Sequence, residues 1–562
     1  MAVGTTALHR RHLFMNADSL RTLDRRIGER RDDAVWIHRP PLDELLASAP
    51  TDASLPLFGQ TFAVKDNIDV AGWPTTAGCP EFSYVPDADA PVVARLRALG
   101  AIPVGKTNLD QFATGLVGTR SPFGIPRSVF SDAHIAGGSS SGSAVAVAAG
   151  LVAFALGTDT AGSGRVPAAF NNIVGLKPTR GVLSTRGVVP ACRSLDCVSI
   201  FARSVAEAHR VFAASREFDA GDPFSRVWKP ESRELRRIGV PRAGQLEFFG
   251  DDGMRALYEQ AQRRFEIAEI DYSPFRDAAR LLYAGPWVAE RTAAVGEFLA
   301  ANPDAGHPVV RQIVMGGAKH SAVESFRASY ELARLRRLAD AEWTKMDAML
   351  LPTTPTIYTV EEVLADPIRL NSNLGTYTNF VNLLDLCALA VPAGFRPDGL
   401  PLGVTLIAPA FHDDALAQLG AAFLREEALH LAATGVDLSV VGAHLSGQPL
   451  NRQLTSRGAQ LVKTCRTASD YRLYALANTT PPKPGLVRAP GFAGPGIETE
   501  VWRMSFEAFG EFVAEVPAPM GIGSVVLEDG ATVKGFLCEV AAIDGAREIT
   551  EFGGWRAFRA AQ

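Results

Sequence analysis

Two serine clusters lie in one glycine-rich stretch, "GGSSSGSAVAVAAGLVAFALGTDTAGSGR", which runs from Gly137 to Arg165. A serine hydroxyl is a weak nucleophile until a base removes its proton, so a catalytic serine here needs a partner. Pro167 follows the second cluster and is typical of the first turn of a helix. The turn before it has four N–H groups that we expect to form an oxyanion hole, those of Thr160, Ala161, Gly162 and Ser163.

The residues alone leave three interpretations of this stretch open. Glycine and serine often form a plain turn with no chemical role. A G-x-S-x-G elbow would make Ser140 the nucleophile, but the preceding "PRSVFSDAHIAGG" is a poor strand and His134 precedes the serine instead of following it. The third interpretation takes Lys65 as the base, because it interrupts the apolar run in "TFAVKDNIDVAG". Burial lowers the pKa of a lysine, and a pKa of roughly 7–8 suits a general base.

Composition limits the class of protein. The chain has 562 residues, of which 47% are hydrophobic, so we expect two or more domains. The net charge of -5 gives no basic bias and argues against nucleic-acid binding. The longest apolar run, 144–156, is interrupted by Gly150 and is too short to span a membrane. We see no signal peptide in the first residues and expect a soluble, cytoplasmic protein.

The six cysteines are spread along the chain, which is typical of free thiols in a reducing compartment. Cys192 and Cys197 are the nearest pair, but "CRSLDC" lacks the spacing and the second pair of a zinc site. We therefore expect no metal.

Short β-branched runs alternate with helical stretches rich in alanine and leucine, which predicts an α/β domain around one sheet. The texture changes near residues 435–440, where a region rich in proline, glycine and strand-like segments begins. We expect a first domain over residues 1–437, with a charged helical lead-in over 1–50, and a smaller α+β domain over 438–562.

Three motifs together, "AVKDNIDV", "GGSSSGS" and "GTDTAGSGRVPAAFNNIVGLKPTRG", resemble the amidase signature family over roughly residues 55–430. The resemblance implies an α/β fold with a central mixed β-sheet flanked by helices, and a Ser–cisSer–Lys triad. Residue by residue, Lys65 matches the base, Ser139 the bridging serine with a cis peptide bond, and Ser163 the nucleophile. Ser140 and Asp159 are candidates for orienting the triad loop, with a plain turn-forming role as the alternative.

Further stretches, "STRGVVPACRSLDCVSIFARSV" and "YAGPWVAERTAAVGEFL", are similar to the allophanate hydrolases within that family. The resemblance implies hydrolysis of allophanate, urea that carries an N-carboxylate, to ammonia and carbon dioxide by a homodimer without a cofactor. Tyr283 and Arg291 match the substrate-binding tyrosine and arginine, and a guanidinium suits a planar carboxylate. Arg311 is the alternative cation, and Gly115 is a candidate for offering a carbonyl oxygen to the substrate amide.

The second domain resembles a γ-glutamyl-cyclotransferase-like module, with "HLSGQPLN" at the place of a tight loop near a pocket. His444 is the one histidine of this region and its candidate for chemistry. Either the domain processes the carboxylated product of the first domain, or it serves assembly and stability.

Other functions stay open at this point. A broader small-amide hydrolase and a transamidase component that acts on aminoacyl-tRNA share the same family, although the lack of a basic bias counts against the second. An inactive scaffold is a further alternative, against which the complete set of Lys65, Ser139 and Ser163 counts. The allophanate would come from a urea carboxylase, in urea catabolism, or from amidohydrolases that degrade s-triazine rings such as cyanurate.

Overall fold

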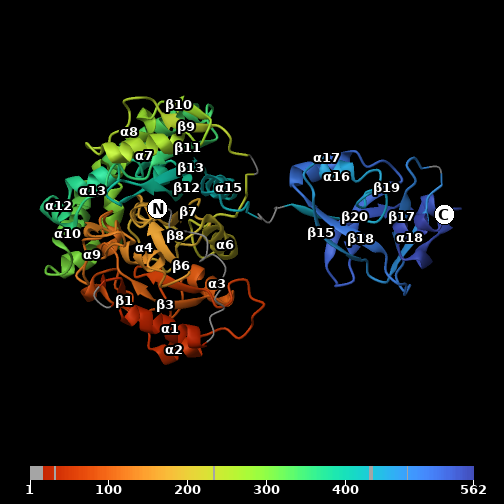
Figure 1. Cartoon of the computed structure of the whole chain (residues 1–562), viewed down its shortest axis with the longest axis horizontal. Helices are drawn as coiled ribbons and strands as arrows, with labels where there is room; N and C mark the ends of the chain where they lie inside the picture. The colour runs from red at the N-terminus through yellow and green to blue at the C-terminus, as the bar shows by residue number, and fades with distance from the viewer. Residues whose placement is uncertain (1–16, 31–32, 232–233, 430–434, 478) are drawn as a thin grey trace. The chain divides into compact units, whose positions relative to one another are not determined.

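The computed structural model describes residues 17–30, 33–231, 234–429, 435–477 and 479–562. The chain divides into two compact units, Met1–Leu429 and His430–Gln562 (Figure 1). The boundary predicted between residues 437 and 438 would cut strand β14 (Val436–Val440), which pairs with two strands of the second unit. The division therefore lies before this strand. Residues 1–16 of the predicted lead-in lie outside the described residues.

One mixed sheet runs through the first unit. Its eleven strands, in spatial order, are β1 (Trp36–His38), β3 (Ile102–Thr107), β2 (Thr61–Lys65), β6 (Phe154–Asp159), β8 (Cys197–Ala202), β7 (Val174–Lys177), β12 (Leu386–Phe395), β13 (Pro401–Pro409), β11 (Ala348–Pro352), β9 (Ile238–Pro241) and β10 (Ile267–Ile270). Strands β3, β2 and β6 are parallel, as are β11, β9 and β10, whereas β6, β8, β7, β12, β13 and β11 pair antiparallel in turn. A short hairpin, β4 (Arg127–Ser128) and β5 (Ser131–Ile135), lies outside this sheet.

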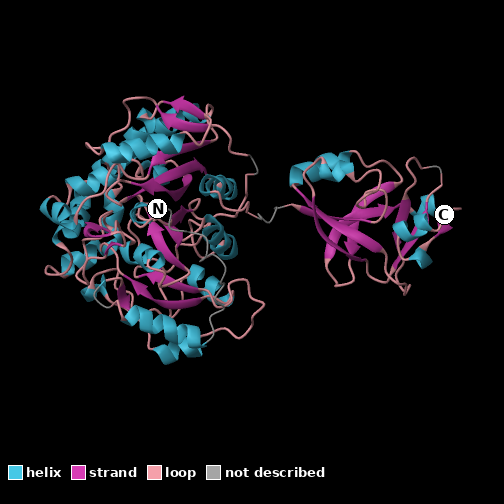
Figure 2. Cartoon of the chain, viewed as in Figure 1, coloured by secondary structure: helices cyan, strands magenta, loops and turns pink. Residues whose placement is uncertain are grey.

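Helices surround the sheet (Figure 2). Those of eight residues or more are α1 (Ala17–Gly28), α3 (Pro91–Ala98), α4 (Ser141–Ala148), α6 (Val205–Ser215), α7 (Asp252–Gln262), α8 (Ser273–Ala284), α9 (Val288–Ala301), α10 (Pro308–Gly316), α11 (Ala322–Trp343) and α15 (Asp413–Leu424). The shorter ones are α2 (Leu42–Ala47), α5 (Val166–Phe170), α12 (Val360–Ala365), α13 (Arg369–Leu374) and α14 (Phe380–Leu383).

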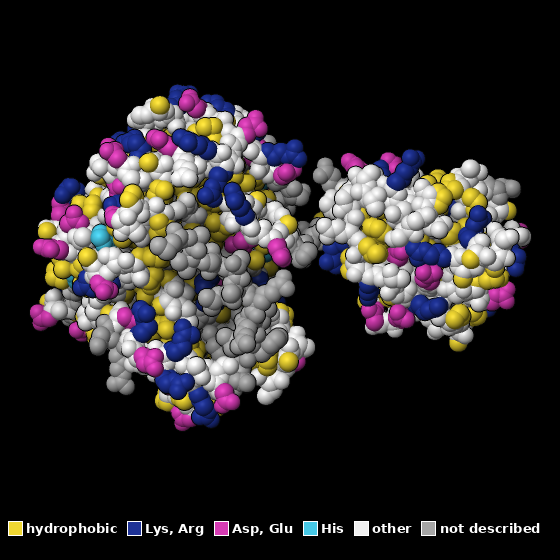
Figure 3. Space-filling view, viewed as in Figure 1, with side chains coloured by type: hydrophobic (Ala, Val, Ile, Leu, Met, Phe, Trp, Pro, Cys, Tyr) yellow, Lys and Arg dark blue, Asp and Glu magenta, His cyan; other side chains and the backbone are white. Residues whose placement is uncertain are grey.

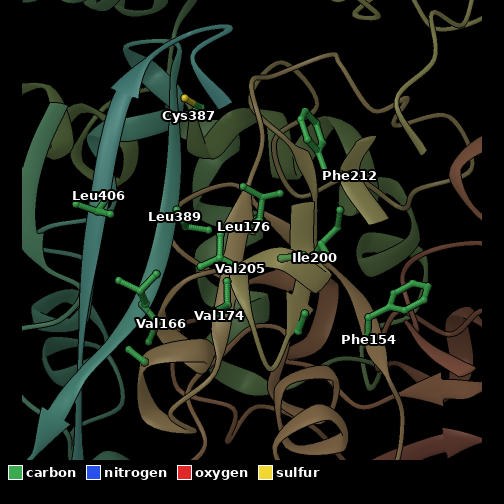
Figure 4. Packing of buried hydrophobic residues seen from close by; sticks show 14 of the residues in the cluster. Phe154, Val166, Val174, Leu176, Ile200, Val205, Phe212, Cys387, Leu389 and Leu406 are labelled. Carbon is green, nitrogen blue, oxygen red and sulfur yellow. The ribbon is translucent and has the colours of Figure 1, made fainter. Parts of the chain in front are cut away.

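The central strands are buried on both faces because helices cover each side. Along β6, Phe154 and Leu156 belong to one core cluster and Ala155 belongs to another, as the alternation of strand side chains requires. Helices α6 and α15 pack on the first face, and α4 packs against β6 on the unit's other core. Figure 4 shows part of the first core, where Val205 and Phe212 of α6 lie beside strand residues such as Ile200.

The second unit has its own core and two sheets. The larger sheet has the order β15 (Gln460–Arg466), β18 (Glu498–Met504), β14, β20 (Thr532–Cys538) and β19 (Met520–Val526). The smaller one has the order β17 (Pro484–Arg488), β16 (Tyr471–Ala475) and β21 (Arg547–Glu548). Three helices complete the unit, α16 (Arg452–Thr455), α17 (Phe506–Ala514) and α18 (Trp555–Ala560). The predicted fold class, a helix-flanked mixed sheet plus a smaller α+β domain, is confirmed.

Candidate active site

The candidate triad residues come from the end of one strand, the loop after its neighbour and the turn before the helix that packs on both strands. Lys65 is the last residue of β2, and Ser163 follows the end of β6 at Asp159. Because β2 and β6 are parallel neighbours, their carboxyl ends meet at the same edge of the sheet. Ser139 lies just before α4, which packs against both strands.

Lys65 contacts Ser139 directly. Its Nζ donates to Ser139 Oγ at 2.7 Å and to Thr158 Oγ1 at 2.7 Å. Both Lys65 and Ser139 are fully buried, and burial lowers the pKa of Lys65 to about 7, against the opposing effect of Asp110, Asp196 and Asp159. A lysine with this pKa is largely neutral just above pH 7 and can accept a proton there.

The backbone around Ser139 is tightly constrained. The Gly138–Ser139 peptide bond is cis. The Gly138 N–H donates to the Leu116 carbonyl at 2.8 Å, and the Ser139 carbonyl accepts from the Asp110 N–H at 3.0 Å. A Cβ on Gly138 would lie 2.1 Å from Asp110 Oδ2, so only glycine fits at this position.

Asp159 and Arg165 form a buried ion pair that encloses the loop of Ser163. Arg165 donates to the two carboxylate oxygens of Asp159 at 2.9 Å each, and both side chains are fully buried. Burial raises the pKa of Asp159, but the charge and hydrogen bonds of Arg165 outweigh it and hold the pKa below its ordinary value. Asp159 also accepts from the Gly162 and Gly164 N–H groups at 3.0 Å each, so it shapes the turn on both sides of Ser163.

These contacts correct the predicted oxyanion hole. The Gly162 N–H is directed at the Asp159 carboxylate three residues earlier, so it is engaged and not free. The N–H groups of Thr160, Ala161 and Ser163 have no acceptor among the described residues. Three of the four predicted donors therefore remain available.

The structure brings Lys65 and Ser139 into contact, whereas no hydrogen bond joins Ser163 Oγ to either of them within the described part of the chain. Ser163 is 3% exposed and lies on the enclosed loop. Ser140 Oγ donates to the Thr158 carbonyl at 3.2 Å, which ties the start of α4 to β6. Ser140 is fully buried. It therefore does not lie on an exposed elbow of the kind that the G-x-S-x-G interpretation requires.

Asp196 was missed by sequence reasoning. It accepts a short hydrogen bond from Thr160 Oγ1 and bonds from the N–H groups of Ala191 at 3.0 Å and Cys192 at 3.2 Å. Burial raises its pKa to about 6. Its one sequence signal is an acidic residue immediately before a buried strand, in "CRSLDCVSIF".

Arg291 lies on α9 and is 1% exposed. Its Nη2 donates to the hydroxyl of Tyr283, from the end of α8, at 3.3 Å, and its Cζ lies 5.2 Å from the centre of the Tyr283 ring. Its Nε and Nη1 are buried and have no hydrogen-bond partner in the described structure. Burial acts to lower the pKa of Arg291, but Tyr283 and nearby acids outweigh it and the pKa lies above its ordinary value. This guanidinium is charged and has two unused donors.

A second buried guanidinium, that of Arg120, lies close enough to Tyr283 and Arg291 for their charges to shift its pKa. Burial lowers the pKa of Arg120, and the neighbouring charges that also shift it are Asp110, Tyr283 and Arg291. Its Nη1 donates to the Thr114 carbonyl at 2.9 Å and its Nη2 to the Pro367 carbonyl at 2.6 Å. No local pattern in the sequence indicates this residue.

Gly115, whose carbonyl oxygen is the predicted acceptor for the substrate amide, follows Thr114 in this loop. A Cβ on Gly115 would lie 2.5 Å from Asp110 Oδ2, so the loop packs closely on that carboxylate. No N–H or O–H of the described residues donates to the Gly115 carbonyl oxygen.

The alternative cation, Arg311, has its hydrogen-bond partners at and just beyond the end of α9. It lies on α10, and its Nη1 donates to the carbonyls of Leu299 at 2.7 Å, Asn302 at 3.1 Å and Ala305 at 3.4 Å. Arg311 therefore caps the C-terminal end of α9, where a cation favours the helix dipole.

In the second unit, His444 lines a cavity of about 210 Å³. Its Nε2 is 2.8 Å from Gln453 Oε1, and its ring stacks on Phe536 with centroids 5.0 Å apart. Burial lowers the pKa of His444, so the ring is neutral at pH 7. Lys483 adds a cation to the same cavity.

Charged side chains of both signs lie on the surface. Lys and Arg side chains are interspersed with Asp and Glu on the faces seen in Figure 3. None of the described helices is long and apolar enough to cross a bilayer. In the described residues, no three His, Cys, Asp or Glu side chains form a group that could hold a metal ion.

Comparison with known proteins places this chain in a family. The family model "Amidase" matches residues 39–417, and the "Allophanate hydrolase C-terminal domain" matches residues 436–560. Urea amidolyase of Lachancea kluyveri is 45% identical over 553 residues, which are 92% of this chain but 30% of that protein. The chain thus spans about a third of the length of such curated relatives.

Two further relatives show how the similarity is distributed. The crystal structure of Kluyveromyces lactis allophanate hydrolase is 41% identical, with a TM-score of 0.76 and 98% of each chain covered. A glutamyl-tRNA(Gln) amidotransferase chain of Symbiobacterium thermophilum is 36% identical over 419 residues, 67% of this chain and 84% of that protein. The chain therefore belongs to the amidase family, and its relatives include urea amidolyase and allophanate hydrolase.

Proposed function

We propose that this chain hydrolyses allophanate, with Arg291 binding the carboxylate and Ser163 attacking the amide carbonyl. The buried Arg291 guanidinium, whose Nε and Nη1 have no partner among the described residues, carries the proposal. An unpaired buried charge is costly, and a planar carboxylate supplies two acceptors that match the guanidinium fork. Tyr283, which contacts Arg291, would donate a further hydrogen bond to the same substrate.

In the first half-reaction, neutral Lys65 accepts the proton of Ser139, and Ser139 accepts the proton of Ser163. The support for this relay is the Lys65–Ser139 contact and the lowered pKa of Lys65. Ser163 Oγ attacks the carbonyl carbon that carries the NH₂ group, and the free N–H groups of its loop stabilise the oxyanion. The C–N bond breaks, the relay returns the proton to nitrogen, and ammonia leaves.

In the second half-reaction, water attacks the acyl-enzyme with the same relay as the base, and Ser163 regains its proton. The product is a nitrogen with two carboxylates, which decomposes in water to ammonia and carbon dioxide. The complete reaction releases two ammonia and two carbon dioxide molecules from each allophanate. Every step uses groups of the chain, so the proposed reaction requires no cofactor.

The name urea amidolyase suggests where the substrate comes from. We propose that a urea carboxylase supplies the allophanate, with s-triazine degradation by other amidohydrolases as the second source. We also propose a homodimer as the working assembly, as the resemblance to allophanate hydrolases implies.

The test is ammonia release from freshly prepared allophanate, with malonamate and simple neutral amides as comparison substrates. We expect the wild-type protein to prefer allophanate, Ser163→Ala to be inactive, and Arg291→Ala to raise KM for the anionic substrates. If the protein prefers neutral amides and Arg291→Ala has no effect, the triad is still functional. Allophanate is then not the substrate.

For the C-terminal unit, the His444 cavity supports a role in processing the dicarboxylate product. Its volume of about 210 Å³ fits a small molecule, and Lys483 offers a cation for a carboxylate. We expect His444→Ala to leave the first ammonia release unchanged and to slow the release of carbon dioxide. Equal rates of carbon dioxide release in both proteins would point to a role in assembly or stability.

A further inference from the structure

Helix α9 is fixed to the segment 190–196 by one carboxylate. Glu290, the residue before Arg291, accepts from Ser194 at both oxygens: from Ser194 Oγ at 2.5 Å and from the Ser194 N–H at 2.8 Å. The Ser194 carbonyl in turn accepts from Arg180 Nη1 at 2.7 Å. Two bonds to one carboxylate define the direction as well as the distance of the contact, so Glu290 holds the first turn of α9 in one orientation.

The same segment contacts the nucleophile loop two residues later. Asp196 accepts from Thr160 Oγ1, which lies on the loop whose N–H groups are free, and from the N–H groups at 191 and 192. Cys192 Sγ also lies 3.8 Å from the Trp287 carbonyl at the start of α9. Segment 190–196 therefore joins the helix of Arg291 to the loop of Ser163.

Arg291 itself has little to fix its position. Its one hydrogen bond within the described structure is the 3.3 Å contact with Tyr283, a residue of the same α8–α9 region. The distance from its guanidinium to Ser163 is thus set by where α9 lies, and α9 is held by Glu290. A binding group displaced by about 1 Å can lower the rate by about a hundredfold, so this anchor matters.

We propose that Glu290, through its paired bonds to Ser194, is a positioning residue for substrate-carboxylate recognition by Arg291. This inference rests on the function proposed above. The alternative is that Glu290 only stabilises α9, since an acidic residue in the first turn interacts favourably with the helix dipole. That role would affect all ligands of the site equally, whereas a positioning role affects ligands that carry a carboxylate.

The test compares Glu290→Gln with Glu297→Gln, the same substitution at an exposed position of the same helix. Malonate and its neutral isostere malonamide serve as competitors in the allophanate assay, and malonate binding is also measured by its effect on Tm. We expect Glu290→Gln to weaken malonate about tenfold and malonamide less than about twofold, since roughly one charge-assisted hydrogen bond is lost. The Glu297→Gln variant should bind malonate and malonamide as tightly as the wild-type protein does.

Ser194→Ala and Ser194→Thr provide the second test, which does not change the charge on α9. Ser194→Ala should weaken malonate selectively, and Ser194→Thr, which keeps the hydroxyl, should restore binding. Equal weakening of malonate and malonamide, or unchanged malonate binding in both Glu290→Gln and Ser194→Ala, would overturn the proposal.

The Tm measurement separates this inference from the proposed function. If the wild-type protein fails to prefer allophanate, the function is wrong, yet selective loss of malonate binding in the variants would still support a positioning role. If the wild-type protein prefers allophanate but the variants bind malonate normally, the function stands and Glu290 has no such role.

Discussion

The Nζ atom of Lys65 lies 2.7 Å from the Oγ atom of Ser139, and both residues are fully buried. No carboxylate forms an ion pair with this lysine among the described residues, and its other partner is the hydroxyl of Thr158. Burial without a direct counter-charge explains why the pKa of Lys65 falls to about 7. The site thus holds a lysine that loses its charge near pH 7 and whose Nζ contacts a hydroxyl.

The first prediction concerns pH. Because the relay needs neutral Lys65, kcat/KM should fall about tenfold per pH unit below pH 7 and level off above it. The measurement is kcat/KM for allophanate between about pH 5.5 and 9, corrected for spontaneous decomposition. An acid limb with its midpoint near pH 4 would instead indicate a carboxylate as the base.

The second prediction moves this midpoint. The negative charge of Asp196 raises the pKa of Lys65, so its removal in Asp196→Asn should shift the acid limb to lower pH. The matched control is Asp366→Asn, which changes an exposed carboxylate paired with Arg369 and should leave the midpoint in place. An unmoved midpoint in both variants would show that Asp196 does not act on the base.

The third prediction concerns Thr158, which sequence reasoning did not select. Thr158→Val keeps the shape but removes the acceptor, so the ammonium form of Lys65 loses a hydrogen bond and its pKa should fall further. We expect a lower kcat with KM nearly unchanged, and recovery in Thr158→Ser, which keeps the hydroxyl. If the serine variant is as impaired as the valine variant, packing and not the hydroxyl is what matters.

The fourth prediction concerns stability. Asp159→Asn leaves the fully buried Arg165 without its counter-charge, which should lower the free energy of unfolding by about 3–5 kcal/mol. Asp366→Asn breaks an exposed pair with Arg369 and should cost less than about 1 kcal/mol. Urea denaturation of both variants measures the difference. Similar losses would mean that the buried pair contributes no more than the exposed one.

The fifth prediction compares two glycines. Gly138→Ala would place a Cβ 2.1 Å from Asp110 Oδ2 and should destabilise the protein by more than about 2 kcal/mol while abolishing activity. Gly316→Ala, in the helical conformation at the end of α10 with nothing within 4 Å of the added Cβ, should raise stability slightly. Thermal unfolding and ammonia release from both variants provide the test.

Features determined by local sequence were predictable. The apolar flank of Lys65 indicated a buried strand, and β2 ends at that lysine with all five residues buried. Pro167 lies in the first turn of α5, as expected. The alternation of strands and helices indicated the fold class, because the spacing of apolar residues within each run is a local feature of the sequence.

Features that depend on residues far apart in sequence were not predictable. Glu290 meets Ser194 across 96 positions, and Thr160 meets Asp196 across 36. Arg120 has no local signal, because a single arginine in a loop is usually solvated. Even the nearby Gly162 was assigned wrongly as a free donor, since the Asp159 side chain turns back onto it and no pattern indicates that direction.

The residues proposed for chemistry and those proposed for recognition come from different parts of the chain. Lys65, Ser139 and Ser163 all come from the stretch that runs from β2 to the loop after β6, whereas Tyr283 and Arg291 come from one continuous region between β10 and β11. Changes confined to this region, with the Glu290–Ser194 contact kept, would alter the proposed recognition residues and leave the proposed reacting groups in place. The architecture therefore allows descendants of one hydrolase to acquire different amide substrates without rebuilding the catalytic machinery.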